Sequence, residues 1–444
     1  MKMPEKPPRT KPLWDTLLKS GPEKIGKILS SGIGPTVEGR YLHWEKLRHR
    51  APPNGLTSEE WWFAIKNRRT SLSKQLPLLS KKQHPFTYGL VDPIPEQLHL
   101  VDLGAGGLIQ MPDQITNPET KDQYYVSSLI EEAITSSQLE GATTTRLVAK
   151  EMIREGRPPQ DRSEQMILNN YMTMQRIGSL KDRPLSMELV FELHRQVTDK
   201  TLDNPDAAGR FRHERERIYV GDDYGEVFHD PPTAHELNDR MAALCDFANG
   251  KTPAEFMHPA IRSVLLHFWL AYDHPFVDGN GRTARALFYW SMLRHKFWLC
   301  EFLSISHVIL KAPIKYYTAF LHTETDENDA TYFILYHLDV LRKAIDELHE
   351  YIGRKTKELK ALEARLRAMG VLNNRQRALI SHALRHPHHR YTIESHKTSQ
   401  NVVYQTARTD LLDLVDRGFL QTEKAGRTFL FVPVSDLEKR LSRS

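Results

Sequence analysis

The residues best suited to chemistry lie in one twelve-residue segment, His274–Arg285, whose sequence is His-Pro-Phe-Val-Asp-Gly-Asn-Gly-Arg-Thr-Ala-Arg. Its glycine-rich turn at 279–281 bends the backbone sharply and exposes N–H groups at the start of a helix, which makes an anion site. Arg282 and Arg285 stand three residues apart, so their guanidinium groups project from nearly the same face of that helix. Two guanidinium groups beside a cradle of amides predict a polyphosphate site.

The same segment supplies a metal ligand and a base. Asp278 would lie beside the phosphates, where Mg²⁺ is held by one or two protein oxygens. His274 is the titratable group of the segment that can take up a proton near neutral pH. Singly, these residues have simpler explanations, such as a helix-end histidine or a turn-forming aspartate. Together they favour a phosphoryl-transfer site.

The elements around this segment are predicted to be mostly helical. Apolar residues recur at spacings of three and four from about 122 to 370; the clearest stretches are 126–155, 187–199, 235–249, 258–273 and 283–300. The helix before the segment should end at His274, because a residue that precedes proline disfavours helical backbone. Residues 209–232, with alternating apolar side chains and several glycines, predict a β-hairpin whose tip is 222–225. The fold class is therefore mainly α with a β-hairpin.

His274–Arg285 resembles the motif of the Fic/DOC (Fido) family, His-Pro-Phe-x-Asp/Glu-Gly-Asn-Gly-Arg-x-x-Arg, and matches each of its fixed positions. The family transfers AMP from ATP to protein hydroxyl groups. The resemblance implies that His274 is the general base, that Asp278 holds Mg²⁺ and that Phe276 packs under the loop. It assigns the phosphates of ATP to Gly279, Asn280, Gly281, Arg282 and Arg285.

Two more segments resemble parts of this family. The hairpin 209–232 is similar to the flap that docks the target segment by β-augmentation. The run 302–322 resembles the stretch that closes over adenine. Within it, Tyr316 and Tyr317 are either nucleotide-binding residues or core aromatics. Neither segment identifies the target protein. The chain itself would also be a target if it modifies its own hydroxyl groups.

The segment Ser136-Ser-Gln-Leu-Glu140-Gly141 could control the predicted site. Ser136 and Glu140 are four residues apart and share a helix face, which alone predicts a polar face ended by Gly141. With the motif downstream, the segment resembles the inhibitory sequence Ser/Thr-x-x-x-Glu-Gly/Asn of Fic proteins. The resemblance implies that Glu140 pairs with Arg285 and competes with the γ-phosphate. An autoinhibited adenylyltransferase is the leading hypothesis, and removal of AMP with the help of Glu140 stays open.

The remaining sequence suggests three more parts beside a core at 113–340. Residues 1–112 are expected to form an N-terminal module, with a helix that begins at Thr57 or Ser58. A heptad-like apolar stripe at 338–369 predicts a linker helix, assigned to 341–371, or a self-pairing coiled coil that would make a homodimer. Residues 372–444 predict three short helices and two strands, the order of a winged helix-turn-helix domain.

DNA is a candidate partner of this C-terminal part. Residues 398–401 are expected to cap a helix over 402–417, with Val403 in the core and Gln405, Arg408 and Thr409 exposed to bases or phosphates. Basic or histidine side chains approach the same helix at Arg375, Arg377, Arg385, His386, His388, His389 and Arg390. Asp410, Asp413 and Asp416 oppose this field, so a protein-contact role stays open. The second function class is thus a DNA-binding regulator whose core senses a nucleotide.

Composition sets wide limits. The chain is 40% hydrophobic and 26% charged, with a formal charge of +5, which is typical of a globular protein. Two isolated cysteines exclude a disulfide framework and favour a reducing, cytoplasmic location. No apolar run approaches the about 18 residues of a membrane span. The glycine-rich stretch 101–107 is expected to be a loop, because the prolines that follow are incompatible with a dinucleotide-binding βαβ unit.

Overall fold

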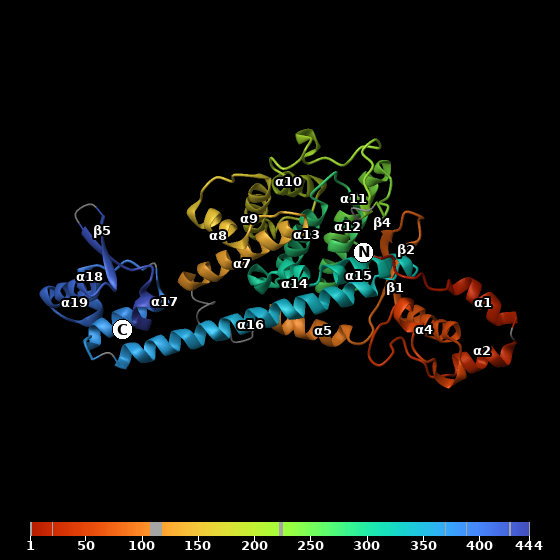
Figure 1. Ribbon diagram of the computed structural model, residues 1–444, viewed down its shortest axis with the longest axis horizontal. Coiled ribbons are helices and arrows are strands. Elements are labelled where there is room, and N and C mark those ends of the chain that lie inside the picture. The colour runs from red at the N-terminus through yellow and green to blue at the C-terminus, as the bar shows by residue number, and fades with distance from the viewer. Residues whose placement is uncertain are drawn as a thin grey trace. The chain divides into compact units, whose positions relative to one another are not determined.

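The computed structural model describes residues 2–19, 21–106, 118–221, 225–368, 370–387, 389–425 and 428–443. The chain divides into two compact units, one made of 1–107 and 128–345 and the other of 108–127 and 346–444. Both are mainly helical, with three small antiparallel hairpins among the described residues, so the predicted fold class is confirmed (Figure 1). No helix in these ranges combines the length and the apolar character needed to cross a membrane.

The N-terminal part of the first unit is held by a well-capped helix, α4 (Ser58–Leu72). The Thr57 hydroxyl accepts from the Glu60 N–H and the Glu60 carboxylate accepts from the Thr57 N–H, which is a capping box. Three aromatic side chains of α4 (Trp61, Trp62 and Phe63) enter one apolar cluster. The other elements are α1 (Thr10–Lys19), α2 (Pro22–Leu29), α3 (Trp44–Leu47), β1 (Ser73–Leu79), β2 (Pro85–Gly89) and α5 (Ile94–Val101).

The glycine-rich stretch after α5 is helical, so the expectation of a loop was wrong over its described part. Residues Asp102–Gly106 form a π-helical turn. A β-carbon added to Gly104 would lie 2.9 Å from Cγ2 of Ile345. Glycine is therefore needed there for close helix packing rather than for a phosphate. Gly107 lies outside the described residues.

Two adjacent helices form the centre of the first unit, α12 (Pro259–Asp273) and α13 (Asn280–Arg294) (Figure 1). The Ser263 hydroxyl donates to the Ser291 hydroxyl across them at 2.8 Å. Nearly all their side chains are buried, as expected for helices that are covered on every side. The unit also contains the second part of α7 (Pro118–Leu139), α8 (Arg146–Glu155), α9 (Arg162–Leu180), α10 (Met187–Val197), α11 (Leu237–Ala248), α14 (Ile305–Lys311), α15 (Pro313–Thr325) and the first part of α16 (Thr331–Ala368).

The hairpin expected at 209–232 is present but its paired part is short. Strands β3 (Val220–Gly221) and β4 (Val227–His229) are antiparallel, with Val220 opposite His229. Of the expected tip, residues 222–224 lie outside the described residues, and Gly225 has a φ of 84° that favours glycine. Gly141, between α7 and α8, likewise has a φ of 90° and divides the long helical pattern predicted at 126–155.

A buried ionic network joins the N-terminal part to the segment between α15 and α16. Lys66 Nζ lies 2.8 Å from Asp326 Oδ1, and both side chains are almost fully buried. Arg69 donates to the Tyr332 hydroxyl at 2.8 Å and to the Leu42 carbonyl oxygen at 2.9 Å. Burial raises the pKa of Asp326, but the charges of Lys66 and Arg69 outweigh it and hold that pKa below its ordinary value.

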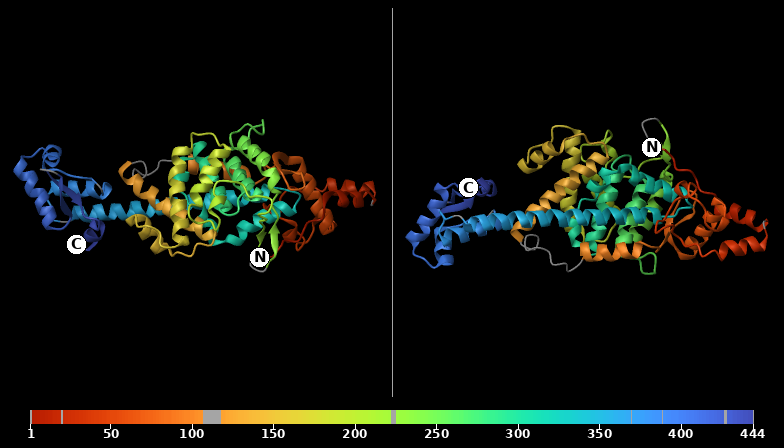
Figure 2. Two further views of the ribbon diagram at one scale, coloured as in Figure 1. Left: turned by 90° about the horizontal axis from the view of Figure 1, so that it is seen from above. Right: turned by 60° about the horizontal axis from the view of Figure 1, so that its bottom comes forward.

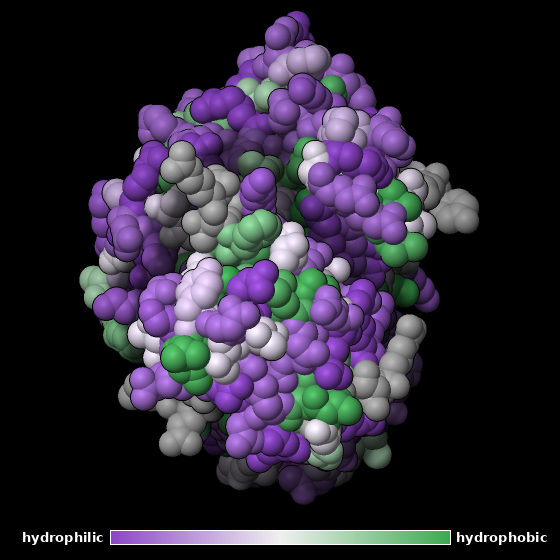
Figure 3. Space-filling model, turned by 90° about the vertical axis from the view of Figure 1, so that its left-hand side faces the viewer, coloured by the Kyte–Doolittle hydropathy of each residue, from purple (hydrophilic) through white to green (hydrophobic). Residues whose placement is uncertain are grey.

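The second unit contains the predicted three helices followed by a hairpin (Figure 2). Its elements after α16 are α17 (Asn374–Arg385), α18 (Ile393–Gln400), α19 (Tyr404–Asp416), β5 (Leu420–Ala425), β6 (Thr428–Pro433) and α20 (Leu437–Arg443). Leu362 and Leu366 of the predicted stripe pack into its apolar cluster. The face of the molecule drawn in Figure 3 shows mostly hydrophilic side chains, with hydrophobic ones in small separate groups.

Two details of the C-terminal part differ from the sequence prediction. Asn401 ends α18 in the left-handed conformation, and α19 begins after Val403 without a side-chain cap, so 398–401 do not cap it. Val403, which was expected in the core, is 68% exposed. Its place before the first helical turn explains this, because the helical periodicity that points Ala407 inward does not yet apply.

We predict that Lys66→Met destabilises the first unit by about 3–5 kcal/mol, because it leaves the Asp326 carboxylate buried without its closest partner. Denaturant unfolding followed by tryptophan fluorescence measures this, since all seven tryptophans lie in the first unit. Lys343→Met is the matched control: Lys343 pairs with Asp339 at the surface and should cost less than about 1 kcal/mol. Equal losses in the two variants would contradict the prediction.

Candidate active site

His274 occupies a tightly held turn between α12 and α13. Its φ of 46° and ψ of 55° are left-handed, an unfavourable backbone state that ends α12 and redirects the chain. The preceding residue, Asp273, is fully buried and accepts from Arg240 Nε at 2.8 Å and Trp269 Nε1 at 2.9 Å. These bonds fix the end of α12 and therefore the place of the His274 ring.

The His274 ring is neutral and presents a free nitrogen. Nδ1 lies 3.2 Å from the Ala271 carbonyl oxygen, which can only accept, so Nδ1 carries the proton. Nε2 is then the unprotonated nitrogen. Burial, opposed in part by the bond to Ala271, lowers the pKa of His274 to about 4. The ring is thus available as a proton acceptor at neutral pH.

The Asn280 side chain closes the loop that follows. The Phe276 N–H donates to Asn280 Oδ1 at 2.9 Å, and Asn280 Nδ2 donates to the Phe276 carbonyl oxygen at 2.8 Å. Both polar atoms of the amide are used within the loop. The group of Asn280 that could still meet a phosphate is its backbone N–H in the first turn of α13.

His194 on α10 holds the loop between α12 and α13, a role that the sequence analysis missed. Its Nδ1 accepts from the Gly209 N–H at 2.9 Å, so the ring proton lies on Nε2, which donates to the Asp278 carbonyl oxygen at 2.9 Å. Burial lowers the pKa of His194 to about 4. The ring also stacks on Phe276, with centroids 3.7 Å apart. A single histidine in an amphipathic helix gives no signal of such a contact.

Arg212 is a second residue that the sequence analysis missed. Its Nε donates to the His274 carbonyl oxygen at 2.9 Å, and its backbone N–H donates to the Pro275 carbonyl oxygen at 2.9 Å. A terminal nitrogen of the same guanidinium donates to the Pro232 carbonyl oxygen. One side chain therefore ties the catalytic turn to both ends of the segment that carries the hairpin.

The start of α13 has the features of an anion site. Gly279 has a φ of 80°, and a β-carbon there would lie 2.6 Å from Thr198. Arg282 is 1% exposed and donates from Nη1 to the Val197 carbonyl oxygen at 2.7 Å. Among the described residues its Nε and Nη2 have no hydrogen-bond partner. Buried donors of this kind are costly unless an acceptor meets them, and a phosphate oxygen would do so.

Asp278 lies at the edge of this site, with 41% of its side chain exposed. One oxygen accepts from the Gly279 N–H at 2.6 Å, and the other lies 3.7 Å from both Arg162 and Arg282. A single half-exposed carboxylate beside phosphate-binding groups suits Mg²⁺, which keeps several of its waters and the oxygens of its phosphates. The expected ligand thus has a suitable place.

The predicted contact between the segment at 136–141 and Arg285 is present. Arg285 is 2% exposed and donates to the Ser136 hydroxyl at 2.7 Å, to the Ser136 carbonyl oxygen at 3.0 Å and to Glu140 Oε1 at 2.8 Å. Burial opposes the charge of Arg285, but Glu140 raises its pKa. A β-carbon added to Gly281 would lie 2.1 Å from Glu140 Oε1. The Glu140 carboxylate therefore lies on the glycine turn.

Glu132 lies one turn before Ser136 in α7, and Glu140 follows directly after the end of this helix. Glu132 is 1% exposed and accepts from the hydroxyl and the N–H of Ser306 and from the hydroxyl of Ser304. These bonds fix the start of α14 to α7. The spacing of four from Glu132 to Ser136 and again to Glu140 was a signal available in the sequence.

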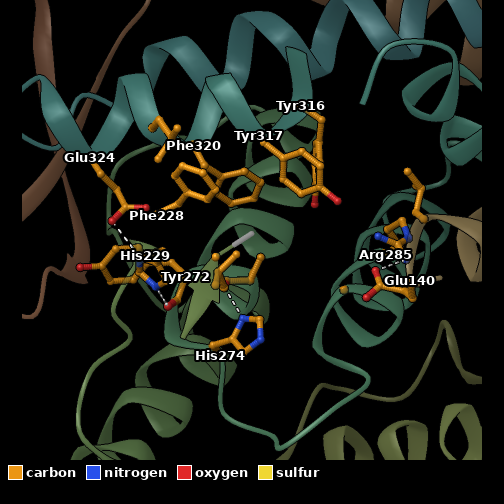
Figure 4. Close-up of a pocket in the computed structure, with 16 residues that line it drawn as sticks. Glu140, Phe228, His229, Tyr272, His274, Arg285, Tyr316, Tyr317, Phe320 and Glu324 are labelled. Carbon is orange, nitrogen blue, oxygen red and sulfur yellow. Dashed lines mark hydrogen bonds and ion pairs between the residues drawn. The ribbon is translucent and has the colours of Figure 1, made fainter. Parts of the chain in front are cut away.

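Four of the residues described above, Glu140, His274, Gly281 and Arg285, border one cavity of about 380 Å³. Figure 4 shows the Glu140–Arg285 pair at one end, His274 on one side and a row of aromatic rings opposite it. The aromatic side chains are Phe228, Tyr272, Tyr316, Tyr317 and Phe320. Both tyrosines of the predicted pair border the cavity, and the Tyr316 hydroxyl is 2.9 Å from His267 Nε2. The flap contributes Val220 and Gly221.

The other end of the cavity carries a charged pair that the sequence analysis did not single out. His229 lies 2.8 Å from Glu324 Oε2 through Nδ1 and 2.7 Å from the Tyr272 carbonyl oxygen through Nε2 (Figure 4). Both partners accept, so the ring makes both bonds only when it is doubly protonated. Burial lowers the pKa of His229, but Glu324 outweighs burial and raises it.

Comparisons with known proteins agree on one domain. Residues 184–292 match the model of the Fic/DOC family. A protein adenylyltransferase Fic of Nematostella vectensis is 37% identical over 107 residues, which are 24% of this chain and 22% of that protein. One of Drosophila virilis is 30% identical over 169 residues, 38% of this chain and 32% of that protein. The chain therefore spans about a fifth to a third of the curated relatives it matches.

One solved structure shares the wider fold. A Fic family protein of Desulfovibrio desulfuricans G20 aligns with a TM-score of 0.52 at 18% identity. The alignment covers 78% of this chain and 97% of that one. At this identity the likeness concerns the fold, and it extends well beyond residues 184–292.

We predict that the free energy of unfolding falls steeply below about pH 6.5, because several buried histidines of this unit, among them His194, His267, His274 and His337, have pKa values lowered mainly by burial. The unfolded chain binds protons to these rings that the folded chain does not, so each ring removes about 2 kcal/mol at pH 5. Denaturant midpoints at pH 7.5 and pH 5 measure the loss.

His337→Phe isolates one contribution. The His337 ring is fully buried, and phenylalanine cannot titrate there. We expect the difference in unfolding free energy between the two pH values to shrink by about 2 kcal/mol, whatever the variant's absolute stability. An unchanged difference would show that His337 is already protonated in the folded state at pH 5.

Proposed function

Because residues 184–292 form a Fic/DOC domain, we propose that this chain is a protein adenylyltransferase, which transfers AMP from ATP to a hydroxyl group of a protein. The observation that carries the proposal is the pairing of a neutral base with an anion site on one cavity. His274 supplies the base, and the turn before Arg282 and Arg285 supplies the anion site. The substrate hydroxyl belongs to a Tyr, Thr or Ser side chain.

The transfer is a single substitution at the α-phosphorus. The hydroxyl oxygen forms a bond to phosphorus while the bond to the β-phosphate oxygen breaks, and pyrophosphate leaves. His274 Nε2 takes the hydroxyl proton, and negative phosphate charge beside the ring raises its low pKa toward neutrality. Asp278 would hold Mg²⁺, which neutralises charge on the phosphates. Arg282 offers its two unpartnered N–H groups to the β-phosphate side.

The aromatic side of the cavity suits the adenosine moiety. Tyr317, Phe320 and Phe228 offer ring surfaces on the side opposite His274 (Figure 4). The β3–β4 hairpin borders the same cavity and has an exposed Val227, so a target segment added to its edge would bring a hydroxyl to His274. Main-chain pairing of this kind constrains the target sequence little.

We propose that Glu140 inhibits the transfer. Its carboxylate binds Arg285 and lies on Gly281, at the helix start where phosphate charge would otherwise be accommodated. Two anions cannot share Arg285 and the glycine turn without strong repulsion in a site with little water. ATP therefore binds with its γ-phosphate displaced while Glu140 holds its position.

We expect Glu140→Gly to raise self-labelling from [α-³²P]ATP with Mg²⁺ by at least about tenfold, since it removes a charge-assisted bond to Arg285. Intact-mass spectrometry checks that the adduct is AMP and locates the modified residue type. Adding His274→Ala should abolish the labelling while ATP analogue binding persists. Labelling that survives in the double variant would remove His274 from the role of base.

The same labelled protein separates transfer from its reversal. Unlabelled wild-type chain is added with Mg²⁺ to Glu140→Gly protein that already carries labelled AMP. Loss of label would assign AMP removal to the wild type, in which Glu140 is present. Stable label would leave Glu140 with the inhibitory role alone.

A second proposal concerns the C-terminal unit, which we infer binds duplex DNA in the manner of a winged helix. Residues 372–444 carry twelve Lys and Arg against seven Asp and Glu, so their excess equals the +5 of the whole chain. Gln405, Arg408 and Thr409 form an exposed face of α19. Two of the opposing acids are neutralised within the unit, Asp410 by Arg375 at 2.7 Å and Asp413 by Arg417 at 2.8 Å.

We predict binding of the full chain to duplex DNA at low salt, with an affinity that falls steeply as salt rises. Arg408→Ala should reduce the slope of log affinity against log salt by about one, because one phosphate contact is lost. Arg417→Ala, at an exposed arginine already paired with Asp413, should leave the slope unchanged. Fluorescence anisotropy with a labelled duplex measures both. No binding at 50 mM salt would favour a protein-contact role.

A further inference from the structure

Helix α15 forms one wall of the cavity and is held from its other side by the N-terminal part. Tyr316, Tyr317, Phe320, Leu321 and Glu324 border the cavity. On the other side of α15, His322 and Thr325 contact the segment at the start of α3. Because a helix is stiff over its four turns, a displacement at this end moves the cavity wall with it.

The contact at Thr325 is a directed chain of hydrogen bonds. His43 is the N-cap of α3, and its Nδ1 accepts from the Glu45 N–H at 3.2 Å. The proton of the neutral ring must then lie on Nε2, which faces the Thr325 hydroxyl oxygen at 3.2 Å. The Thr325 hydroxyl in turn donates to the Leu321 carbonyl oxygen at 2.5 Å. The chain thus runs from α3 to the backbone of a residue that lines the cavity.

These hydrogen bonds need a neutral His43 ring, and the ring is neutral at neutral pH. His43 is 1% exposed, and burial, together with the neighbouring His322, lowers the pKa of His43 to about 3. A protonated ring would point a second N–H at the Glu45 N–H and break the cap. The direction of the three bonds is therefore fixed over the working pH range.

The same residues do not fit a metal site, although His43, Glu45 and His322 have ligand atoms within 4.8 Å of one another. The two rings are stacked, with centroids 4.1 Å apart and planes 6° apart. Histidine lone pairs lie in the ring plane, and one ion cannot lie in two parallel planes. His43 Nδ1 is also occupied by the Glu45 N–H. Packing and hydrogen bonding, not coordination, are what this cluster supplies.

We propose that His43, which lies outside the cavity, positions the nucleotide-binding wall of the cavity through two hydrogen bonds. One runs from His43 Nε2–H to the Thr325 hydroxyl, and the other from that hydroxyl to the Leu321 carbonyl oxygen. The N-terminal part is then a functional component of the nucleotide site as well as a support. This inference rests on the proposed adenylyltransferase function. His43 and Thr325 are positioning residues, since neither borders the cavity.

The variants His43→Asn and Thr325→Val separate the positioning of the cavity wall from simple stabilisation of the fold. His43→Asn keeps the cap, because the Asn side-chain oxygen accepts from the helix N–H groups, but its shorter amide does not reach Thr325. Thr325→Val keeps the volume and removes the hydroxyl. Thr325→Ser restores the hydroxyl and is the conservative control. All are made in the Glu140→Gly chain, so that transfer is measurable, and tryptophan fluorescence confirms that each is folded.

The readouts are the Kd of α,β-methylene-ATP with Mg²⁺ by calorimetry and the KM and kcat for self-labelling. We expect His43→Asn and Thr325→Val each to raise Kd and KM about fivefold, the worth of one net hydrogen bond, with kcat unchanged. The double variant should be no worse than either single one, because both break the same chain. Thr325→Ser should bind like the parent.

The contrary outcomes are distinct. A Kd equal to the parent's in both single variants, or an additive double variant, would overturn the positioning role while leaving the nucleotide site intact. A lower unfolding midpoint with unchanged KM would reduce the contact to a structural one. Absence of analogue binding in the Glu140→Gly parent itself would overturn the proposed function and this inference with it.

Discussion

A buried arginine that requires an anionic partner governs this structure. Arg285 is almost completely removed from water, and an unpaired charge there would cost several kcal/mol. In the structure the partner is Glu140, supported by two bonds to Ser136. In catalysis the partner would be a phosphate. The inhibition proposed above would therefore need no separate regulatory surface, because Arg285 would bind either Glu140 or a phosphate.

The turn around His274 shows how such a site is kept rigid. Its left-handed backbone is unfavourable by itself and persists because neighbouring groups fix it from several directions. Arg212 binds the His274 carbonyl oxygen, Asn280 closes the following loop and His194 holds the Asp278 carbonyl oxygen. Each of the bonds uses a backbone group of the loop. The side chains of His274 and Asp278 therefore remain available for chemistry.

Two of the buried ion pairs of the first unit differ in their surroundings. The Lys66–Asp326 network joins the N-terminal part to the helices and is closed to a ligand. The Glu140–Arg285 pair borders the cavity, where a phosphate could take the place of Glu140. Between them runs α15, whose two sides contact the two regions. The N-terminal part and the cavity are thus mechanically related, although they are far apart in sequence.

The sequence determined the site where chemistry and spacing are local. The motif His274–Arg285, the i and i+4 relation of Ser136 and Glu140, the helical periods and the order of the C-terminal elements follow from short-range patterns. Tertiary structure alone decided the rest. His194, Arg212, His43 and Glu324 act through partners between 62 and about 280 residues away or across separate elements, and no local pattern encodes such distances.

Both within the motif and outside it, packing changed what residue type and spacing implied. Asn280 is a natural phosphate ligand by composition, but its amide is consumed by the Phe276 backbone. Val403 fits a core periodicity but precedes the helix that the periodicity describes. Sequence fixes which groups are available at a turn or on a helix face. Which of their atoms stay free depends on the neighbours that folding brings, because a donor, acceptor or charge that a neighbour already engages is less available to a ligand.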